Sequence, residues 1–414
     1  MTDRGPLDAI SPLDGRYARY TEPLSEYASE AALMRARVRV EVAYLLALAD
    51  LEATPLSLDD ETRADLRGLY ESFDADDADV VKRLETEGYD GYAATNHDVK
   101  AVEYFVRMAL PDEAEQGPWV HFGLTSEDVN NLAHRLLVKP AVETVLAPAI
   151  RELRDELAAA AREHRDVPML ARTHGQPATP TTYGKELAVY ASRLGRALGR
   201  LEAAAGDLSG KLAGASGTYA AHRAAYPGVD WRAFAGEFVE SLGLEHTPLT
   251  TQVNPCDDLA AVFDALRGVN KTKANSDLTF LADYVTTSRL QRDLSDSTVK
   301  RNVGAAFAHC LIGYRKTAAG LEKVTPNETV IREELEANPE VIGEAVQTIL
   351  RREGDTDAYE RVRKLTRGQQ VDLEDFRELF DELDVEESVR EELRELTPAG
   401  YTGVGSDLVD ELDG

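Results

Sequence analysis

The chain has 414 residues, of which 43% are hydrophobic and 29% charged, the balance of an ordinary globular protein with two or three domains. Its formal net charge of −29 disfavours nucleic acid as a partner, because a phosphate backbone is bound by cationic surfaces. No apolar run approaches the roughly 18 residues that a membrane span needs, so no membrane partner is expected.

The composition also bears on the cellular setting. The first residues lack the apolar segment of a secretion signal, and Cys256 and Cys310 are too few for a disulfide framework and lack metal-ligand spacing. We therefore expect a reduced, cytoplasmic protein without a metal. The acidity is spread along the chain, and only 11 of the 46 basic residues are lysines, which suggests a surface that stays hydrated at high salt. A halophilic source is our hypothesis.

Helical periodicity dominates the chain, and period-two alternation is almost absent, so we expect no strands. Residues Leu24–Leu51 carry a broad apolar stripe. The segment His97–Leu110 reads as a second helix, with Thr95 or Asn96 placed to cap it.

Three long helical stretches follow, and their alanine and leucine content is typical of tightly packed bundle helices. They are Ser126–Arg165, Thr181–Leu208 and Asp257–Leu290. Pro140 and Pro148 should kink or divide the first of them. Shorter helical segments come after residue 325. The predicted fold is all-α, with an N-terminal helical domain (1–112), a central long-helix bundle (113–325) and a C-terminal helical domain (326–414).

Two short polar segments near the N-terminus contain residues suited to binding or proton transfer. SPLDGRY places Arg16 and Tyr17 after a glycine turn, where a guanidinium can hold a phosphate or carboxylate; a surface turn is the alternative, and these residues alone favour it. TNHDVK groups Asn96, His97 and Asp98 at a helix start. A histidine beside a carboxylate can serve as acid or base, although the same residues also suit a helix cap.

Two further segments lie next to the long helices. HFGLTSED puts Thr125 and Ser126 at a helix N-terminus, where N–H groups and hydroxyls can bind an anionic oxygen or simply cap the helix. RTHGQPATP places His174 in a loop punctuated by glycine and proline between two long helices. Loops held by rigid helices often carry binding and catalytic groups, so His174 is unlike a core histidine.

The last polar segment, SRLQRDLSDSTVKRN, combines cations with hydroxyl groups in an otherwise acidic chain. Arg292, Ser297 and Arg301 suit an anionic ligand such as a phosphate. The alternative is a helix start whose charges are paired by Asp293 and Asp296.

Together these segments form a specific pattern. DGRY, TNHDVKAVEYF, HF..TSEDVNNL, RTHGQPATP, TTQ at 250–252 and SR.QRDLSDSTVKRN occur in the order and helical setting of adenylosuccinate lyases. The C-terminal LTRG and LTPAGYTG fit as well. Over nearly all of residues 7–412 the chain resembles the bacterial-type branch of that family, within the fumarase/aspartase superfamily.

The resemblance implies an all-α homotetramer whose central helices form a shared bundle, with active sites built from several subunits. It implies a small nucleotide substrate and no cofactor. The implied reaction eliminates fumarate from adenylosuccinate to give AMP, and likewise cleaves the succinyl-carboxamide ribotide of purine biosynthesis. A base removes a proton beside a carboxylate, an acid protonates the departing nitrogen, and cations and fixed dipoles stabilise the carbanionic intermediate.

The same resemblance assigns roles to individual residues. His174 would be the general acid, and His97, with Asn96 and Asp98, would contact the substrate and support that acid. The remaining substrate-binding residues fall into three groups. Thr125 and Ser126 would bind a succinyl carboxylate, Gln252 would contact the substrate, and the nucleotide and its phosphate would be held by Arg16, Tyr17, Arg292, Ser297 and Arg301.

One part of the family pattern has no counterpart in the sequence. The family's general base is a serine in a loop of the form GSS.MP.K.NP, which also supplies a lysine and an asparagine. Here Asn270 is followed directly by Lys271, and the resemblance places about 40 missing residues at this junction. Lys273, Asn275 and Ser276 lie nearby at a spacing unlike the loop motif, so we do not expect them to replace it.

Three explanations are open. The segment is omitted from the sequence of an ordinary lyase, a natural deletion has impaired the enzyme, or the chain is a non-catalytic scaffold or an inactive subunit of a mixed assembly. The remaining motifs are intact, which favours omission or a recent deletion. Argininosuccinate lyase shares the superfamily fold and is the alternative enzyme, but the stretch Arg292–Arg301 suits a nucleotide phosphate that argininosuccinate lacks.

Overall fold

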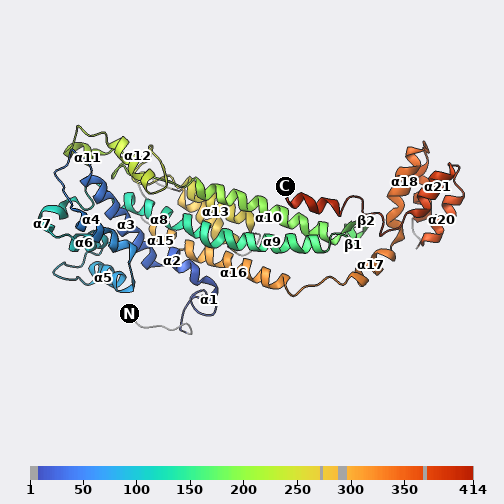
Figure 1. The fold of residues 1–414 in the computed structure, drawn as a ribbon, viewed down its shortest axis with the longest axis horizontal. Helices are drawn as coiled ribbons and strands as arrows, with labels where there is room; N and C mark the ends of the chain where they lie inside the picture. The colour runs from blue at the N-terminus through green and yellow to red at the C-terminus, as the bar shows by residue number, and fades with distance from the viewer. Residues whose placement is uncertain (1–7, 271–273, 288–295, 367–370, 414) are drawn as a thin grey trace. The chain divides into compact units, whose positions relative to one another are not determined.

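The computed structural model describes residues 8–270, 274–287, 296–366 and 371–413. Helices make up most of these residues and the strands are short, which confirms the all-α fold class (Figure 1). The chain divides into two compact units. Unit 1 comprises Met1–Ile150 and Ala197–Arg315, and unit 2 comprises Arg151–Arg196 and Lys316–Gly414. The three-domain division with boundaries near residues 112 and 325 stays a prediction.

The first part of unit 1 consists of helices of very different length, of which α3 is the longest. They are α1 (Ala18–Thr21), η1 (Glu22–Leu24), α2 (Ser25–Ala28), α3 (Glu30–Ala49), α4 (Asp60–Glu71), α5 (Ala75–Thr86), α6 (Asp98–Met108), α7 (Glu113–Gln116), η2 (Gly117–Trp119), α8 (Ser126–Ala141) and the π-helical η3 (Val142–Leu146). The second part returns with β3 (Ser209–Gly210), α11 (Ala220–Ala225), α12 (Trp231–Ser241), β4 (Glu245–His246), α13 (Asp257–Val269), α14 (Ala274–Val285), α15 (Asp296–Lys300) and α16 (Val303–Leu321), which runs past the end of the unit.

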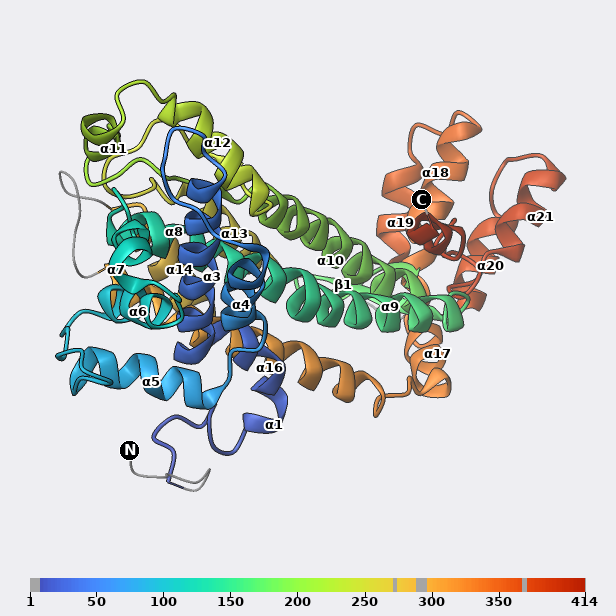
Figure 2. The same cartoon turned by 60° about the vertical axis from the view of Figure 1, so that its left-hand side comes forward.

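Helix α3 lies at the centre of unit 1 and packs against α4, α6 and α8 (Figures 1 and 2). It carries the apolar stripe predicted over Leu24–Leu51, and the hydroxyl of Ser29 caps it by accepting from the Ala32 N–H at 3.1 Å. Because the helix is covered on most sides, two of its charged residues, Arg37 and Glu41, are also buried, at 1% and 0% exposure. Charges are rarely buried without a partner, so these two residues need one nearby.

Helix α6 confirms the predicted helix over His97–Leu110 but has a different cap. His97 is the N-cap residue, and its Nδ1 accepts from the Lys100 N–H at 3.2 Å. The prediction of Thr95 or Asn96 was wrong because an N-cap residue needs extended backbone angles. His97 has them, whereas Asn96 is left-handed with φ of 50°.

The two prolines predicted to interrupt the long helix over Ser126–Arg165 stand on either side of an irregular turn. Pro140 lies at the end of α8, and Pro148 lies in the first turn of α9 (Ala147–Glu163). Between them η3 adopts the wider π-helical turn. Proline lacks the N–H that an α-helical turn requires, and a π turn is one way in which a helix shifts its hydrogen bonding.

The stretch predicted over Asp257–Leu290 forms two helices, α13 and α14, that pack against each other. Asn270 ends α13 and is buried, at 5% exposure. Its Nδ2 donates to Cys310 Sγ at 2.9 Å, and its carbonyl accepts from Asn275 Nδ2 at 2.7 Å. Phe280 of α14 is 52% exposed, so this hairpin presents apolar surface.

Unit 2 begins with most of α9, followed by β1 (Pro168–Thr173), β2 (Gln176–Thr182) and the start of α10 (Tyr183–Gly206). The expectation of no strands was wrong here. The antiparallel pairing of β1 with β2 shifts register between Met169 and Ala171. A register irregularity breaks the two-residue alternation by which strands are recognised in a sequence, which explains why this hairpin was missed.

The rest of unit 2 is a group of short helices after residue 325, and Figure 2 shows α18 to α21 gathered together. These are α17 (Glu328–Glu336), η4 (Pro339–Ile342), α18 (Gly343–Arg352), α19 (Ala358–Thr366), α20 (Leu373–Asp381), α21 (Glu387–Glu395) and η5 (Asp407–Asp413). Their shared core includes Val346, Leu350, Phe376, Phe380 and Leu393, all nearly or completely buried. The predicted helical character of this part is therefore confirmed, and it has a hydrophobic core of its own.

Candidate active site

The N-terminus of α8 brings together three of the predicted substrate-binding residues. Thr125 is the N-cap residue and Ser126 the first residue of the helix, and both are partly exposed. Gln252, which lies 127 positions further along the chain, donates from Nε2 to Thr125 Oγ1 at 3.0 Å. The helix terminus adds backbone N–H groups and a partial positive charge. This arrangement suits one end of a carboxylate-containing ligand.

A buried ion pair holds this helix terminus in place. Asp128 and Lys211 are both fully buried, and Lys211 Nζ lies 2.8 Å from Asp128 Oδ1. The Asp128 carboxylate also accepts from the Thr125 N–H at 2.9 Å and from the backbone N–H groups of Ala213 and Gly214 at 2.9 and 3.1 Å. One carboxylate thus ties the start of α8 to the segment after β3.

Residues at the start of α6 lie beside the α8 terminus. His97 Nε2 is 3.4 Å from Ser126 Oγ, which joins the TNHDVK and TSED segments. Asp98 accepts from Arg37 at 2.8 Å and from Arg301 at 3.0 Å. Burial alone would raise the pKa of the Asp98 carboxyl, but the charge of Arg37 and the hydrogen bond from Arg301 lower it to about 2. Asp98 is therefore an anion that organises two guanidinium groups, and Asn96 precedes it in the left-handed turn.

Arg301, one of the predicted phosphate-binding residues, directly follows α15. Besides Asp98 it contacts Glu30, with Nε to Oε2 at 2.9 Å, and its Nη1 donates to the carbonyl of Ser297 at 3.2 Å. The structure thus brings Arg301, Ser297 and Asp98 together. Arg292 lies outside the described residues.

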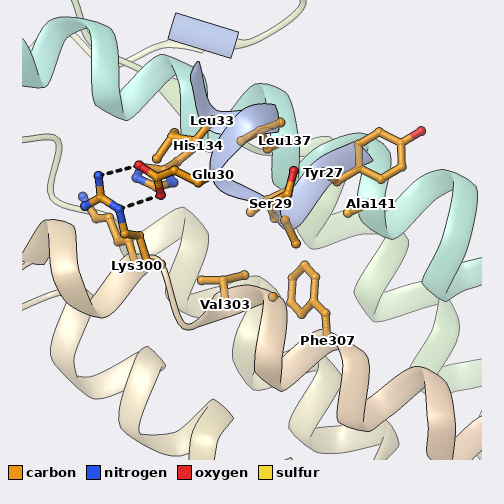
Figure 3. Close-up of a pocket in the computed structure, with 14 residues that line it drawn as sticks. Tyr27, Ser29, Glu30, Leu33, His134, Leu137, Ala141, Lys300, Val303 and Phe307 are labelled. Atoms are coloured by element: carbon orange, nitrogen blue, oxygen red, sulfur yellow. Dashed lines mark hydrogen bonds and ion pairs between the residues drawn. The ribbon is translucent and has the colours of Figure 1, made fainter. Parts of the chain in front are cut away.

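A cavity of about 110 Å³ lies next to Arg301, between α2, α3, α8 and α16. Figure 3 shows His134 and Lys300 on its wall, with dashed lines for the two bonds between Glu30 and Arg301. Burial, followed by the charge of Lys300, lowers the pKa of His134 well below its ordinary value, so this ring is neutral. Lys300 also lies 3.2 Å from the buried carboxylate of Glu127. One side of the cavity is therefore lined by charged groups in ion pairs, and the other side by apolar side chains.

Arg16 and Tyr17 stand near a larger cavity of about 750 Å³ without lining it. The cavity is bordered by their neighbours Asp14 and Ala18 and, on the other side, by Arg301. Arg16 is exposed, and Tyr17 is partly buried where it precedes α1. The SPLDGRY segment thus comes close to the predicted phosphate-binding arginine, although these two side chains make no contact with it that the structure describes.

His174 lies in unit 2, at the tip of the hairpin formed by β1 and β2. Thr173 pairs with Gln176, so His174 and Gly175 are the two central residues of the turn. Both have positive φ, 52° and 79°, as a type I′ turn requires. The imidazole is exposed at this tip. Its role together with the residues of unit 1 stays a prediction.

The structure adds two residues that the sequence reasoning missed, His121 and its partner Glu41. His121 Nδ1 lies 2.5 Å from Glu41 Oε1. The histidine lines a groove of about 260 Å³ together with His97, Lys100 and Ser126. Burial lowers the pKa of His121, but the charge of Glu41 outweighs it and raises the pKa above its ordinary value. A signal existed in the sequence, because His121 precedes the TSED cap closely and Glu41 interrupts an apolar helix.

The described residues contain no cluster of histidine, cysteine, aspartate or glutamate side chains that would hold a metal ion. None of the described helices is long and apolar enough to span a membrane.

Comparison with known proteins agrees with these features. A family model described as Lyase matches residues 15–284, and one described as Adenylosuccinate lyase C-terminal matches residues 288–402. The chain is 38% identical to the adenylosuccinate lyase of Haemophilus influenzae over 98% of this chain and 99% of the relative. It is also 38% identical to the Escherichia coli enzyme over the same shares and 36% identical to that of Dictyostelium discoideum over 97% and 98%.

This chain belongs to the adenylosuccinate lyase family. Solved structures of more distant proteins agree with the fold alone. A fumarate lyase from Mesorhizobium sp. BNC1 superimposes with a TM-score of 0.72 at 22% identity, covering 94% of this chain and 97% of that one. A carboxy-muconate cycloisomerase from Acinetobacter calcoaceticus gives 0.68 at 20% identity, over 94% and 97%.

Length separates this chain from its adenylosuccinate lyase relatives. The alignment with the Haemophilus influenzae relative extends over 461 positions, whereas this chain has 414 residues. At least 47 positions, 461 less 414, therefore have no residue in this chain. The motif pattern places about 40 missing residues at Asn270–Lys271, and that position stays a prediction.

Proposed function

We propose that this protein is an adenylosuccinate lyase that eliminates fumarate from adenylosuccinate to give AMP, and that it also cleaves the succinyl-carboxamide ribotide of purine biosynthesis. The observation that carries the proposal is its likeness to adenylosuccinate lyases along the whole chain. The contacts between the TNHDVK, TSED and TTQ segments support it, because residues far apart in sequence meet at one helix terminus.

The succinyl end of the substrate would lie at the N-terminus of α8. Thr125 and Ser126 would donate hydroxyl and backbone hydrogen bonds to a carboxylate, and Gln252 would orient Thr125 through the bond at 3.0 Å. His97 would add its Nε2–H, because its Nδ1 already accepts a backbone hydrogen bond. Preorganised donors of this kind stabilise the charge that develops on the carboxylate when the adjacent carbon loses its proton.

The nucleotide end would be bound by cations from the SPLDGRY and QRDLSDSTVKRN segments. Arg301 is held by Glu30 and Asp98 and would be offered to the phosphate already oriented. The other members of this set are Arg16, Tyr17, Arg292 and Ser297, with Asn96 in the adjoining turn.

His174 would protonate the departing nitrogen as the general acid. Its place at the tip of a hairpin leaves the imidazole free to reach a bound ligand. We further infer a cytoplasmic homotetramer with composite active sites, so that the hairpin of one subunit would serve a site formed by others. Size measurement in solution tests this assembly, since a monomer with full activity would contradict it.

Fumarate release from adenylosuccinate by the purified chain, together with calorimetric measurement of adenylosuccinate binding, tests the function. We expect both binding and turnover. Binding without turnover would reduce the chain to a ligand-binding homologue, and absence of both would support a scaffold role. Argininosuccinate serves as the control substrate and should neither bind nor react, because it has no phosphate for Arg301 to hold.

A further inference from the structure

The two histidines of the groove beside α8 are held in opposite hydrogen-bonding states. His97 Nδ1 accepts the Lys100 N–H at 3.2 Å, so the hydrogen of its neutral ring is on Nε2. That nitrogen lies 3.4 Å from Ser126 Oγ. His97 therefore faces its surroundings as a hydrogen-bond donor.

His121 has the reverse arrangement. Its Nδ1 lies 2.5 Å from Glu41 Oε1, and a carboxylate can only accept, so the hydrogen is on Nδ1. In the neutral ring Nε2 then carries the lone pair. Among the described residues Nε2 of His121 has no hydrogen-bond partner, and the side chain is 19% exposed where it lines the groove. His121 therefore offers a basic nitrogen next to the donor of His97.

Glu41 is suited to support a histidine that gains a proton. Its side chain is fully buried in α3, and its second oxygen, Oε2, has no hydrogen-bond partner among the described residues. An unneutralised carboxylate at such a place strongly favours a cation beside it. A carboxylate that orients an imidazole by Nδ1 and stabilises the imidazolium is a recurring arrangement for general bases.

The other charged groups around His121 are already paired. On α6, Lys100 Nζ lies 2.7 Å from Glu103. On α8, Asp128 is bound by Lys211 at 2.8 Å. The charge that responds to protonation of His121 is therefore chiefly that of Glu41.

We propose that His121, oriented by Glu41, is the base that removes the proton from the succinyl group in this chain. The assignment rests on the proposed lyase function and fills the role that a serine loop, absent from this sequence, has in the family pattern. Nε2 takes the proton, and the electron pair of the C–H bond becomes the second bond of the fumarate double bond. The C–N bond breaks, its electron pair stays on the purine nitrogen, and His174 protonates that nitrogen.

The pH dependence of the elimination rate follows from the charge of Glu41 beside His121. Only the neutral ring accepts a proton, and Glu41 raises the pKa of His121 above its ordinary value. The rate should therefore fall as the pH falls through that raised pKa. In Glu41→Gln the His121 ring loses its anionic partner, so its pKa should fall. The acidic limb of the pH–rate profile should then move to lower pH, and the maximal rate should also decrease.

The test combines kcat from fumarate release with adenylosuccinate affinity from calorimetry. In His121→Asn we expect kcat to fall by about 10²–10⁴-fold, the usual contribution of a general base, while affinity is kept. His246→Gln is the matched control, since His246 lies in a different pocket with Asp230 and Arg232, and its kcat should be unchanged. NMR titration of the His121 ring in the native chain and in Glu41→Gln measures directly how far Glu41 raises the pKa of His121.

Several outcomes overturn the assignment. A raised KM with normal kcat in His121→Asn would make His121 a binding residue, and an unmoved acidic limb in Glu41→Gln would refute the role of Glu41. If the native chain and His121→Asn have the same kcat, His121 is not the base, but the proposed lyase function is unaffected. A native chain that binds adenylosuccinate but releases no fumarate refutes both.

Discussion

Replacing Asp128 by asparagine should destabilise the protein more than replacing its partner. Asparagine keeps the shape of the side chain but loses its charge, so the Lys211 ammonium stays fully buried with neutral oxygen acceptors alone, among them the Gly214 carbonyl, 3.1 Å away. Removing one member of a buried ion pair costs about 3–5 kcal/mol, because the remaining charge is uncompensated. We expect that loss of unfolding free energy in Asp128→Asn.

Lys211→Met should cost less, about 1–3 kcal/mol, since it removes one charge-assisted bond from a carboxylate that keeps others. Asp128 would still accept the N–H groups of Thr125, Ala213 and Gly214. The double variant should be less destabilised than the sum of the single ones, because neither buried charge is then left alone.

Urea unfolding followed by circular dichroism, at one fixed protein concentration, measures these differences. The reasoning is refuted if Lys211→Met is destabilised as much as Asp128→Asn, or if Asp128→Asn loses less than about 1 kcal/mol, the level of an ordinary neutral hydrogen bond.

Three further predictions concern charge and chain length. With a net charge of −29, the urea midpoint should rise from dilute buffer to molar salt, where the Debye length shrinks from about 10 to about 3 Å; equal midpoints would contradict a halophilic origin. Asp98, whose pKa is lowered from 3.8 to about 2, should stabilise the fold by about 2 kcal/mol above pH 4 and lose this as the pH falls from 4 to 2. The unfolding free energies of the native chain and Asp98→Asn should therefore converge over that window, and a constant gap would speak against the ion pairs of Asp98. Sequencing the gene across Asn270–Lys271 should return the direct connection, and a serine loop there would show that the segment had been omitted.

The sequence predicted the helices because helical periodicity and capping residues are visible in it, and its polar segments supplied the candidate site residues. Apolar periodicity gave α3 and α6 in outline, and the prolines located the irregular turn between α8 and α9. The structure places Thr125 against Gln252 and Asp98 against Arg301, and the roles of these residues stay predictions. The segments could not show which of them lie next to each other. Gln252 and Thr125 are 127 positions apart, and such contacts depend on tertiary packing, not on the local sequence pattern.

The misses have physical causes of the same kind. His97 became the cap of α6 because backbone angles decide capping, and those angles are set by the turn at Asn96. Glu41 looked like an ordinary polar position of an amphipathic helix, yet α3 is buried around most of its circumference and its carboxylate has to find His121. A single sequence shows that a residue is charged but not that the folded protein buries it away from water.

Backbone strain connects several of these residues. Among the described residues, six that are not glycine have positive φ, and Asn96, His121 and His174 belong to them. The left-handed conformation costs most L-residues about 1–2 kcal/mol, and such strain gathers at functional sites where it positions a side chain. Three site residues in this small set indicate that the imidazoles of His121 and His174 are presented by strained turns, at some expense of stability.

His174 allows this idea to be tested, because its turn has a known optimum. Asn-Gly is the preferred central pair of a type I′ turn, so His174→Asn should stabilise unit 2 by about 0.5–1 kcal/mol while kcat falls by about 10²–10⁴-fold. His164→Asn is the matched control: His164 packs on Tyr183 and lies 3.8 Å from Glu328, so this change should lower stability. Urea midpoints and fumarate release measure the two effects. If His174→Asn were less stable than the native chain, His174 would stabilise the turn instead of straining it, and backbone strain would not indicate a catalytic role.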